Sequence, residues 1–158
     1  MKILLVGQAP GRRIGGDAPL AGRAGRRLAA VMGLTYEEYL RVCDRINLLD
    51  SWGGKRGKGD AFNLKDARRR AAQMNLFGYD VVLFIGVAVA RVFGEDGPIL
   101  IWHNTGAQRR IIIPHPSGIN RWWNDKANLE QAQLALGELS QPLRNSVDNM
   151  LLIYCNAR

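Results

Sequence analysis

The chain has 158 residues, of which 47% are hydrophobic and 23% charged, with 18 Gly and 6 Pro. This composition is typical of a globular protein rather than a disordered one, and the length fits one domain, residues 1–158. Lys and Arg number 22 against 14 Asp and Glu, a net charge of +8 that attracts polyanions. Nucleic acid is therefore the first candidate partner, although many soluble proteins are basic without a specific reason.

The two cysteines, Cys43 and Cys155, lie far apart in the sequence. They predict neither a disulfide framework nor a four-cysteine metal or cluster site, which suits a reducing compartment. No apolar stretch approaches the roughly 18 residues of a membrane span. We therefore expect a soluble monomer with no metal, no cofactor and no membrane partner. We expect it in the cytoplasm, at the nucleoid, or in a host cytoplasm if the source is viral.

The first half of the chain alternates short apolar runs with helical patterns. Residues 2–6 predict a buried strand that delivers a loop at Gly7–Gly11. Helical spacing and stop signals predict helices at 24–32 and 36–43, the second with a Thr35–Glu38 capping box. A second strand is expected at 45–49, followed by the Gly- and Lys-rich loop 51–59.

The second half repeats this alternation, which is typical of an α/β fold. The expected helices are 65–74, capped by Asn63 or Asp60, then 87–93 and 126–139, the last ended by Pro142. The expected strands are 80–85 and 109–113. Residues 150–154 are apolar enough to dock as a strand or a helical turn, and the sequence leaves both open. The three arginines 68–70 fit a solvated helix face or a phosphate contact.

Two loops carry residues that suit chemistry. Gly7-Gln8-Ala9-Pro10-Gly11 can bring backbone close to a ligand, although a sharp turn alone would also explain it. His115-Pro116-Ser117 offers an imidazole for a developing oxyanion and a hydroxyl for a phosphate, or simply a rigid turn. Trp122 and Trp123 stand beside Arg121, which suits stacking on DNA or packing in a core.

The order of GQAPG, GRAG, INLL, LFIG and IIIPHPSGIN over residues 3–140 resembles the uracil-DNA glycosylase superfamily. It is similar to the branch whose first motif is Gly-Glu-Ala-Pro-Gly and whose last is His-Pro-Ser. The resemblance implies a three-layer α/β/α fold with a central, largely parallel four-stranded sheet. It also implies a site at the carboxyl ends of the strands that flips a base out of single- or double-stranded DNA.

The resemblance assigns roles to individual residues. Asn47 would read the Watson–Crick edge of the base, and His115 would stabilise negative charge on the departing base. Ser117 would pinch a phosphate, Gly86 would end the central strand, and Trp122 or Ile119 would fill the space that the base leaves. The remaining candidates for base contact are Gly7, Ala9 and Leu20, and those for DNA contact are Lys55, Arg56, Lys58, Gly118, Asn120 and Arg121.

The chain also departs from the family's pattern. The water-positioning acid falls at Gln8 or Ala9, and neither can act as a base, so Gln8 would only orient water. Asp17 could supply a carboxylate, although an exposed turn would also explain it. Leu20 replaces an aromatic ring that stacks on uracil, which favours a different base, such as a modified pyrimidine or a deaminated purine. The cluster cysteines of the similar branch are missing.

Three functions follow from these patterns. The first is a monofunctional DNA glycosylase that hydrolyses the bond to a flipped-out base and leaves an abasic site. The second is a catalytically weak or inactive protein of the same fold that binds modified or flipped bases in DNA. The third is a small α/β enzyme acting on free nucleotides, for which the charge of +8 and the tryptophan pair would be unneeded.

Overall fold

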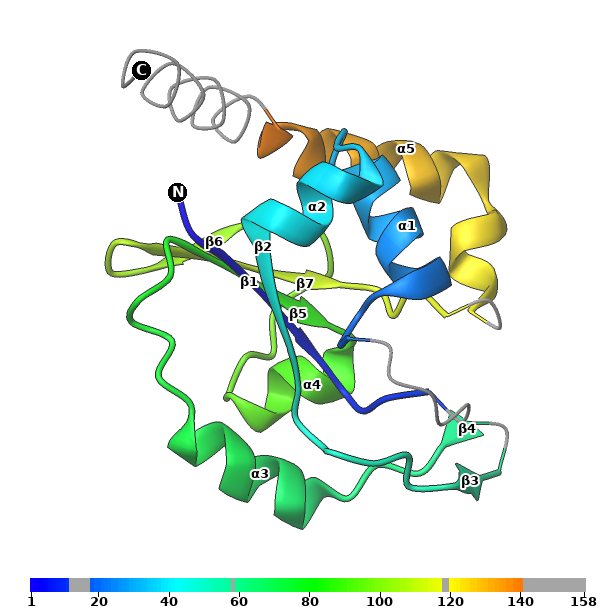
Figure 1. The fold of residues 1–158 in the computed structure, drawn as a ribbon, viewed down its shortest axis with the longest axis vertical. Helices are drawn as coiled ribbons and strands as arrows, with labels where there is room; N and C mark the ends of the chain where they lie inside the picture. Colours follow the sequence, from blue (N-terminus) through cyan, green and yellow to red (C-terminus); the bar gives the residue numbers. More distant parts are fainter. Residues whose placement is uncertain (12–17, 58, 118–119, 141–158) are drawn as a thin grey trace, which may run out of the picture.

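The core of the fold is a five-stranded sheet with strand order β2-β1-β5-β7-β6 (Figure 1). The computed structural model describes residues 1–11, 18–57, 59–117 and 120–140. Four neighbouring strands run parallel and one edge strand, β6, runs antiparallel to β7. The strands are β1 (Ile3–Gly7), β2 (Cys43–Asn47), β5 (Val81–Ile85), β6 (His103–Thr105) and β7 (Gln108–Ile113).

Helices cover both faces of this sheet, as the continuous burial of β1 and β5 requires. One face packs against α1 (Gly22–Val31), α2 (Tyr36–Val42) and α5 (Lys126–Gly137), in a core that includes Leu5, Leu28 and Leu136. The other face packs against α3 (Leu64–Gln73) and α4 (Val87–Val92), in a core that includes Val6 and Ala67. The three-layer α/β/α prediction is confirmed.

The structure adds strands that the sequence did not predict. The expected four parallel strands are present, and β6 extends the sheet to five. The second strand, expected at 45–49, begins two residues earlier, at Cys43, because it pairs with β1 from Ile3 onward. The sequence of β6, His-Asn-Thr, lacks the alternation of apolar and polar residues that predicts a strand. The strand forms because His103 pairs with Arg110 of β7 and Thr105 pairs with Gln108. Within the expected loop 51–59, β3 (Lys55–Arg56) pairs with β4 (Gly59–Asp60) in a two-stranded hairpin.

Local signals placed the helix starts well. Both hydrogen bonds of the Thr35–Glu38 capping box are present. The Glu38 N–H donates to Oγ1 of Thr35 at 3.1 Å, and the Thr35 N–H donates to Oε2 of Glu38 at 2.7 Å. Asn63 caps α3 through the N–H groups of Lys65 and Asp66. Within the described ranges no helix is both long and apolar enough to span a bilayer. Pro142 and residues 150–154 lie outside the described residues.

The parallel arrangement brings four strand ends to one edge of the sheet. These ends are Gly7 of β1, Asn47 of β2, Ile85 of β5 and Ile113 of β7. In an α/β sheet such an edge is the usual place for a ligand. The motif loops from the two ends of the chain both begin here.

Candidate active site

Gly7 is the point where β1, β2 and the segment before α1 meet. Gly7 and Asn47 are Cα partners, and the Leu48 N–H donates to the Gly7 carbonyl at 3.0 Å. A Cβ atom added to Gly7 would lie 2.5 Å from Oδ1 of Asn47 and 3.2 Å from the Leu20 side chain. The Asn47 amide and Leu20 therefore occupy space that only glycine leaves open. The structure thus brings together three of the expected base-contacting residues.

Leu20 has a left-handed backbone, with φ of 53°. This conformation costs a residue other than glycine roughly 1–2 kcal/mol. Its carbonyl accepts a hydrogen bond from the Tyr39 hydroxyl at 2.9 Å, and Gly25 of α1 approaches the same carbonyl so closely that a Cβ there would collide with it. Burial raises the pKa of Tyr39, so its hydroxyl remains a donor. Strain that the core holds in place in this way is typical of functional sites.

The His115 loop is held from several sides. The carbonyl of His115 accepts hydrogen bonds from Nδ2 of Asn120 and Nε1 of Trp123, each at 2.9 Å. The Ser117 N–H donates to Nδ1 of His115 at 3.3 Å. Since Nδ1 accepts, we assign the proton of the neutral imidazole to Nε2. This tautomer gives the ring a donor suited to a developing negative charge.

Arg27 of α1 ties the same loop to the helical layer. Its Nη1 lies 3.4 Å from the carbonyl oxygens of both Pro116 and Ser117. Its guanidinium lies 5.7 Å from the centre of the Trp123 ring, which is 5% exposed. Trp123 is therefore a core residue that also positions the loop. The contact of Arg27 with this loop has no local sequence pattern, because the residues lie about 90 positions apart in the chain.

A cavity of about 370 Å³ joins the two motif loops. Gln8 from the first loop and His115 from the last both line it, with Gly86 between β5 and α4. Gly86 has a φ of 107°, and a Cβ there would lie 3.8 Å from Cβ of His115. Asn120 and Trp122 also line the cavity, whereas Asn47 and Leu20 flank it at Gly7, next to Gln8. Ala9 is half-buried and does not line it.

The described lining of this cavity contains no carboxylate. Gln8 can accept and donate hydrogen bonds but cannot remove a proton from water at neutral pH. Asp17, the other candidate acid, lies outside the described residues. The polar side chains that the two motif loops contribute to the cavity are therefore the imidazole of His115 and the amide of Gln8.

The expected DNA-contacting residues fall into distinct groups. Lys55, Arg56 and Arg121 are exposed, and the hairpin that carries the first two lies at the carboxyl-end side of the sheet (Figure 1). Asn120 is engaged inside the protein, since its amide also caps the short 3₁₀ helix η1 (Arg121–Asn124). Trp122 forms a cavity wall and packs edge-to-face on Trp123 at 4.8 Å. Lys58, Gly118 and Ile119 lie outside the described residues.

No cluster of three or more His, Cys, Asp or Glu side chains in the described ranges could hold a metal ion. Cys43 is buried beneath α2, and burial raises the pKa of its thiol to about 12. A protonated, buried thiol behaves as a small apolar side chain.

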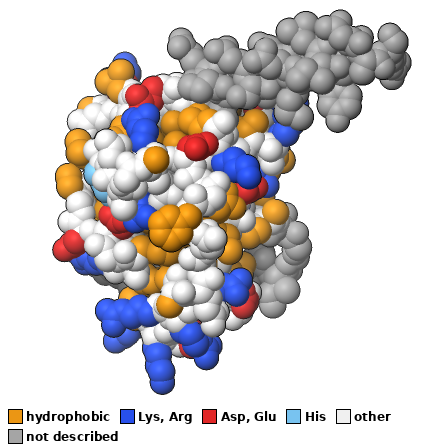
Figure 2. All heavy atoms as spheres, turned by 90° about the vertical axis from the view of Figure 1, so that its left-hand side faces the viewer, with side chains coloured by type: hydrophobic (Ala, Val, Ile, Leu, Met, Phe, Trp, Pro, Cys, Tyr) orange, Lys and Arg blue, Asp and Glu red, His pale blue; other side chains and the backbone are white. Residues whose placement is uncertain are grey.

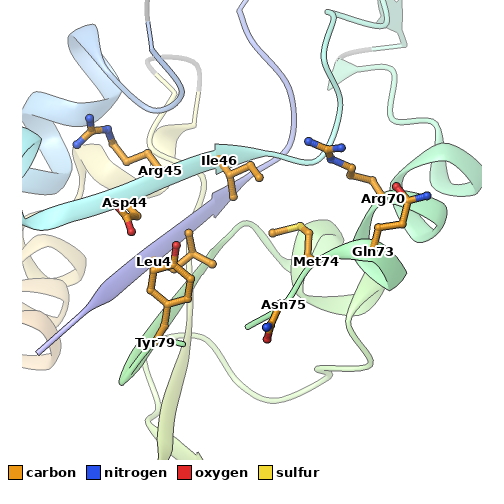
Figure 3. Close-up of a pocket in the computed structure, with 9 residues that line it drawn as sticks. All are labelled: Leu4, Asp44, Arg45, Ile46, Arg70, Gln73, Met74, Asn75 and Tyr79. Carbon is orange, nitrogen blue, oxygen red and sulfur yellow. The ribbon is translucent and has the colours of Figure 1, made fainter. Parts of the chain in front are cut away.

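A larger hollow, about 480 Å³, lies elsewhere, between β2 and α3 (Figure 3). Its lining includes the apolar side chains of Leu4, Ile46 and Met74 and the polar groups of Asp44 and Tyr79. Burial, with a hydrogen bond to Asp44, raises the pKa of Tyr79. None of the residues that line it belongs to either motif loop, so volume alone does not locate the active site.

Together, the fold and the polar cavity at the strand ends define a three-layer α/β protein with a ligand site at the carboxyl edge of a parallel sheet. The family model of the uracil DNA glycosylase superfamily matches residues 1–139, and the chain belongs to this superfamily. Comparison with curated proteins finds no significant match. The superfamily consists generally of glycosylases that hydrolyse a base from DNA.

Proposed function

We propose that the protein is a monofunctional DNA glycosylase that acts as a monomer on a flipped-out base other than plain uracil. The observation that supports this most directly is the cavity shared by Gln8 and His115, with the Asn47 amide beside it at Gly7. Its volume of about 370 Å³ is near the lower end of the range for small-ligand sites. Leu20, in place of an aromatic ring, leaves room for a modified pyrimidine or a deaminated purine.

In this proposal the bond between C1′ of deoxyribose and the base nitrogen breaks with both electrons going to the base. Nε2–H of His115 stabilises the base anion, which takes up the proton that water loses, and the water oxygen bonds to C1′. Asn47 holds the Watson–Crick edge of the base, because its amide lies against Gly7 at the end of β2, next to Gln8 of the cavity. Gln8 orients the water, and Ser117, Lys55 and Arg56 hold phosphates.

Gln8 determines how fast such an enzyme can be. Loss of a general base typically costs about 10²- to 10⁴-fold in rate. A dissociative transition state with positive charge on the sugar tolerates a weak nucleophile, so hydrolysis continues slowly. We expect turnover well below that of a family member with an acid at this position.

A second candidate is a protein that binds flipped or modified bases without cleaving them. The described cavity lining without a carboxylate favours it. The two candidates are separated by incubating the protein with oligonucleotides that carry uracil, deaminated purines or modified pyrimidines, then cleaving abasic sites with alkali. Strand cleavage supports the glycosylase. Tight binding without cleavage at any base supports the second candidate.

A further inference from the structure

Helix α3 carries four cationic side chains and one carboxylate within ten residues. The cations are Lys65, Arg68, Arg69 and Arg70, and all four are exposed. The helix is anchored instead by Ala67 and Ala71, which are 0% and 9% exposed and belong to the apolar core under the sheet. The arginines are therefore not needed to pack the helix.

Most of this charge is uncompensated. Arg69 lies 3.2 Å from Asp66, and among the described residues Lys65, Arg68 and Arg70 form no ion pair. Like charges three and four positions apart on a helix, such as Lys65 with Arg68 and Arg69, destabilise it. Two exposed cations on other helices are compensated, since Arg91 of α4 pairs with Asp96 and Lys126 of α5 pairs with Glu130. Arg23 and Arg26 of α1 and Arg41 of α2 are exposed without an ion pair among the described residues, but only α3 carries three consecutive arginines. A polyanion would supply the missing counter-charge on α3.

The position of α3 links this charge to the active site. A hollow of about 410 Å³ is lined by Leu48–Ser51, which directly follow Asn47, and by Arg69, Arg70 and Gln73 of α3. Figure 2 shows Lys and Arg side chains gathered at the lower end of the molecule, where Figure 1 places α3. In the close-up of the neighbouring hollow, Arg70 extends from α3 toward the chain after β2 (Figure 3).

Carboxylates decide where on this surface a phosphate can lie. Asp50 and Asp66 line the hollow, so its interior is not a phosphate site. Asp66 is compensated by Arg69 and by a hydrogen bond from Nδ2 of Asn63. The outward face of α3, with Lys65 and Arg68, therefore presents the net positive charge.

We propose that α3 is a second DNA-binding surface, which holds the phosphodiester backbone several nucleotides away from the flipped base. The inference rests on the proposed function, because it takes DNA as the substrate. Ten helical residues span about 15 Å, which corresponds to about four phosphates on one strand of B-DNA. Specific base contacts are not part of this surface, since guanidinium groups on phosphates position DNA without reading its sequence.

Two triple variants with equal changes in net charge test this proposal. The first replaces the α3 arginines (Arg68→Ala, Arg69→Ala, Arg70→Ala). The control removes exposed cations from α2, α4 and α5 (Arg41→Ala, Arg91→Ala, Lys126→Ala). Alanine favours helix at every one of these positions, and circular dichroism verifies that both variants fold.

Binding is measured on two oligonucleotides, of about 30 and about 6 nucleotides, each with the target base in the middle. The long one extends beyond the cavity to α3, whereas the short one occupies the cavity alone. We expect the α3 variant to bind the long oligonucleotide at least about tenfold more weakly and to lower the slope of log K against log salt by on the order of 2. The control variant should keep both values, and the short oligonucleotide should bind all three proteins equally.

An equal loss in the control variant, an equal loss on both lengths, or no loss at all would overturn the role of α3. Failure of the proposed function gives a different result. If wild-type protein releases no base from either oligonucleotide but the α3 variant still loses only long-oligonucleotide binding, the glycosylase assignment falls and the surface stands. If wild-type protein binds neither oligonucleotide, both fall.

Discussion

The side-chain oxygen of Asn47 lies against the backbone of Gly7, 2.5 Å from where a Cβ atom would be. This contact makes the first motif loop and the end of β2 a single unit. The glycine of the first motif is therefore required by its neighbour as well as by its turn, because any side chain there would displace the amide that reads the base in our proposal.

Replacing Gly7 with alanine should impair base recognition more than stability. The new methyl group would push the flexible Asn47 side chain aside, so we expect base release to fall by roughly 5- to 150-fold, the value of a lost polar contact of about 1–3 kcal/mol. Single-turnover assays and thermal melts measure the two effects. Gly11→Ala is the matched control, because a Cβ there meets no atom of the described residues within 4 Å. Equal losses in both variants would argue against the Asn47 contact.

His115→Ala should remove the donor to the departing base while leaving the loop's backbone contacts in place. Loss of one such donor costs about 10²- to 10³-fold in the rate of the chemical step. DNA affinity should change by no more than a few fold, since phosphate contacts dominate binding. Base release and gel-shift titrations measure the two quantities. A variant that releases the base at the wild-type rate would refute the role of His115.

Gln8→Glu would place a carboxylate in the cavity beside His115. If the lack of a proton acceptor limits the rate, the substitution should release the nucleobase at least about 10-fold faster, which is a part of the 10²- to 10⁴-fold that an optimally placed general base contributes. Gln8→Ala serves as the control and should be slower than wild type. A glutamate variant no faster than the alanine variant would mean that Gln8 does not orient the attacking water.

Trp123→Phe should loosen the His115 loop by deleting the hydrogen bond to the His115 carbonyl. A lost hydrogen bond of this kind costs about 0.5–1.5 kcal/mol of stability, and we expect base release to fall several fold. Trp102→Phe is a matched control, because Nε1 of Trp102 donates a hydrogen bond of 2.8 Å to the Ala135 carbonyl. Neither Trp102 nor Ala135 lines the cavity. Thermal melts should show similar destabilisation in both variants. Slower base release in both would make the effect one of stability alone.

Cys43 should resist alkylation in the folded protein. Burial raises the pKa of its thiol to about 12, so little thiolate exists at pH 8. Peptide mapping after iodoacetamide treatment, with and without urea, measures this, and modification of Cys43 in the native protein would contradict its burial.

Because the pKa of the Cys43 thiol is higher in the folded than in the unfolded protein, the thiol's contribution to stability is complete at neutral pH. It is lost as the pH rises from about 9 toward 12. Cys43→Ala should show a shallower alkaline decline.

The sequence predicted the elements whose signals are local. The Thr35–Glu38 box, the stop at Gly33 and the buried runs of β1 and β5 each depend on a few neighbouring residues. Motif order led to the family, and the family led to the grouping of Gly7, Leu20 and Asn47 that the structure contains. The position of His115 beside Gln8 followed from the parallel sheet.

Contacts between distant segments had no such signal. The polar strand β6 forms only because β7 offers an edge, and the pairing of Arg27 with the His115 loop joins two ends of the chain. Asn120 looked like a DNA contact, but its amide holds the His115 carbonyl. The left-handed backbone of Leu20 depends on Tyr39, which follows it by 19 residues. Such features require the folded chain, since no local pattern encodes them.

The proposed function depends on release of a base from DNA at the Gln8–His115 cavity. The most direct test incubates wild-type protein and His115→Ala with a set of oligonucleotides, each carrying one candidate base, and quantifies alkali-labile sites over time. We expect slow cleavage at a modified pyrimidine or deaminated purine by wild-type protein and about 10²-fold less by the variant. Cleavage at uracil alone would contradict the substrate proposal, and no cleavage at any base would contradict the enzyme itself.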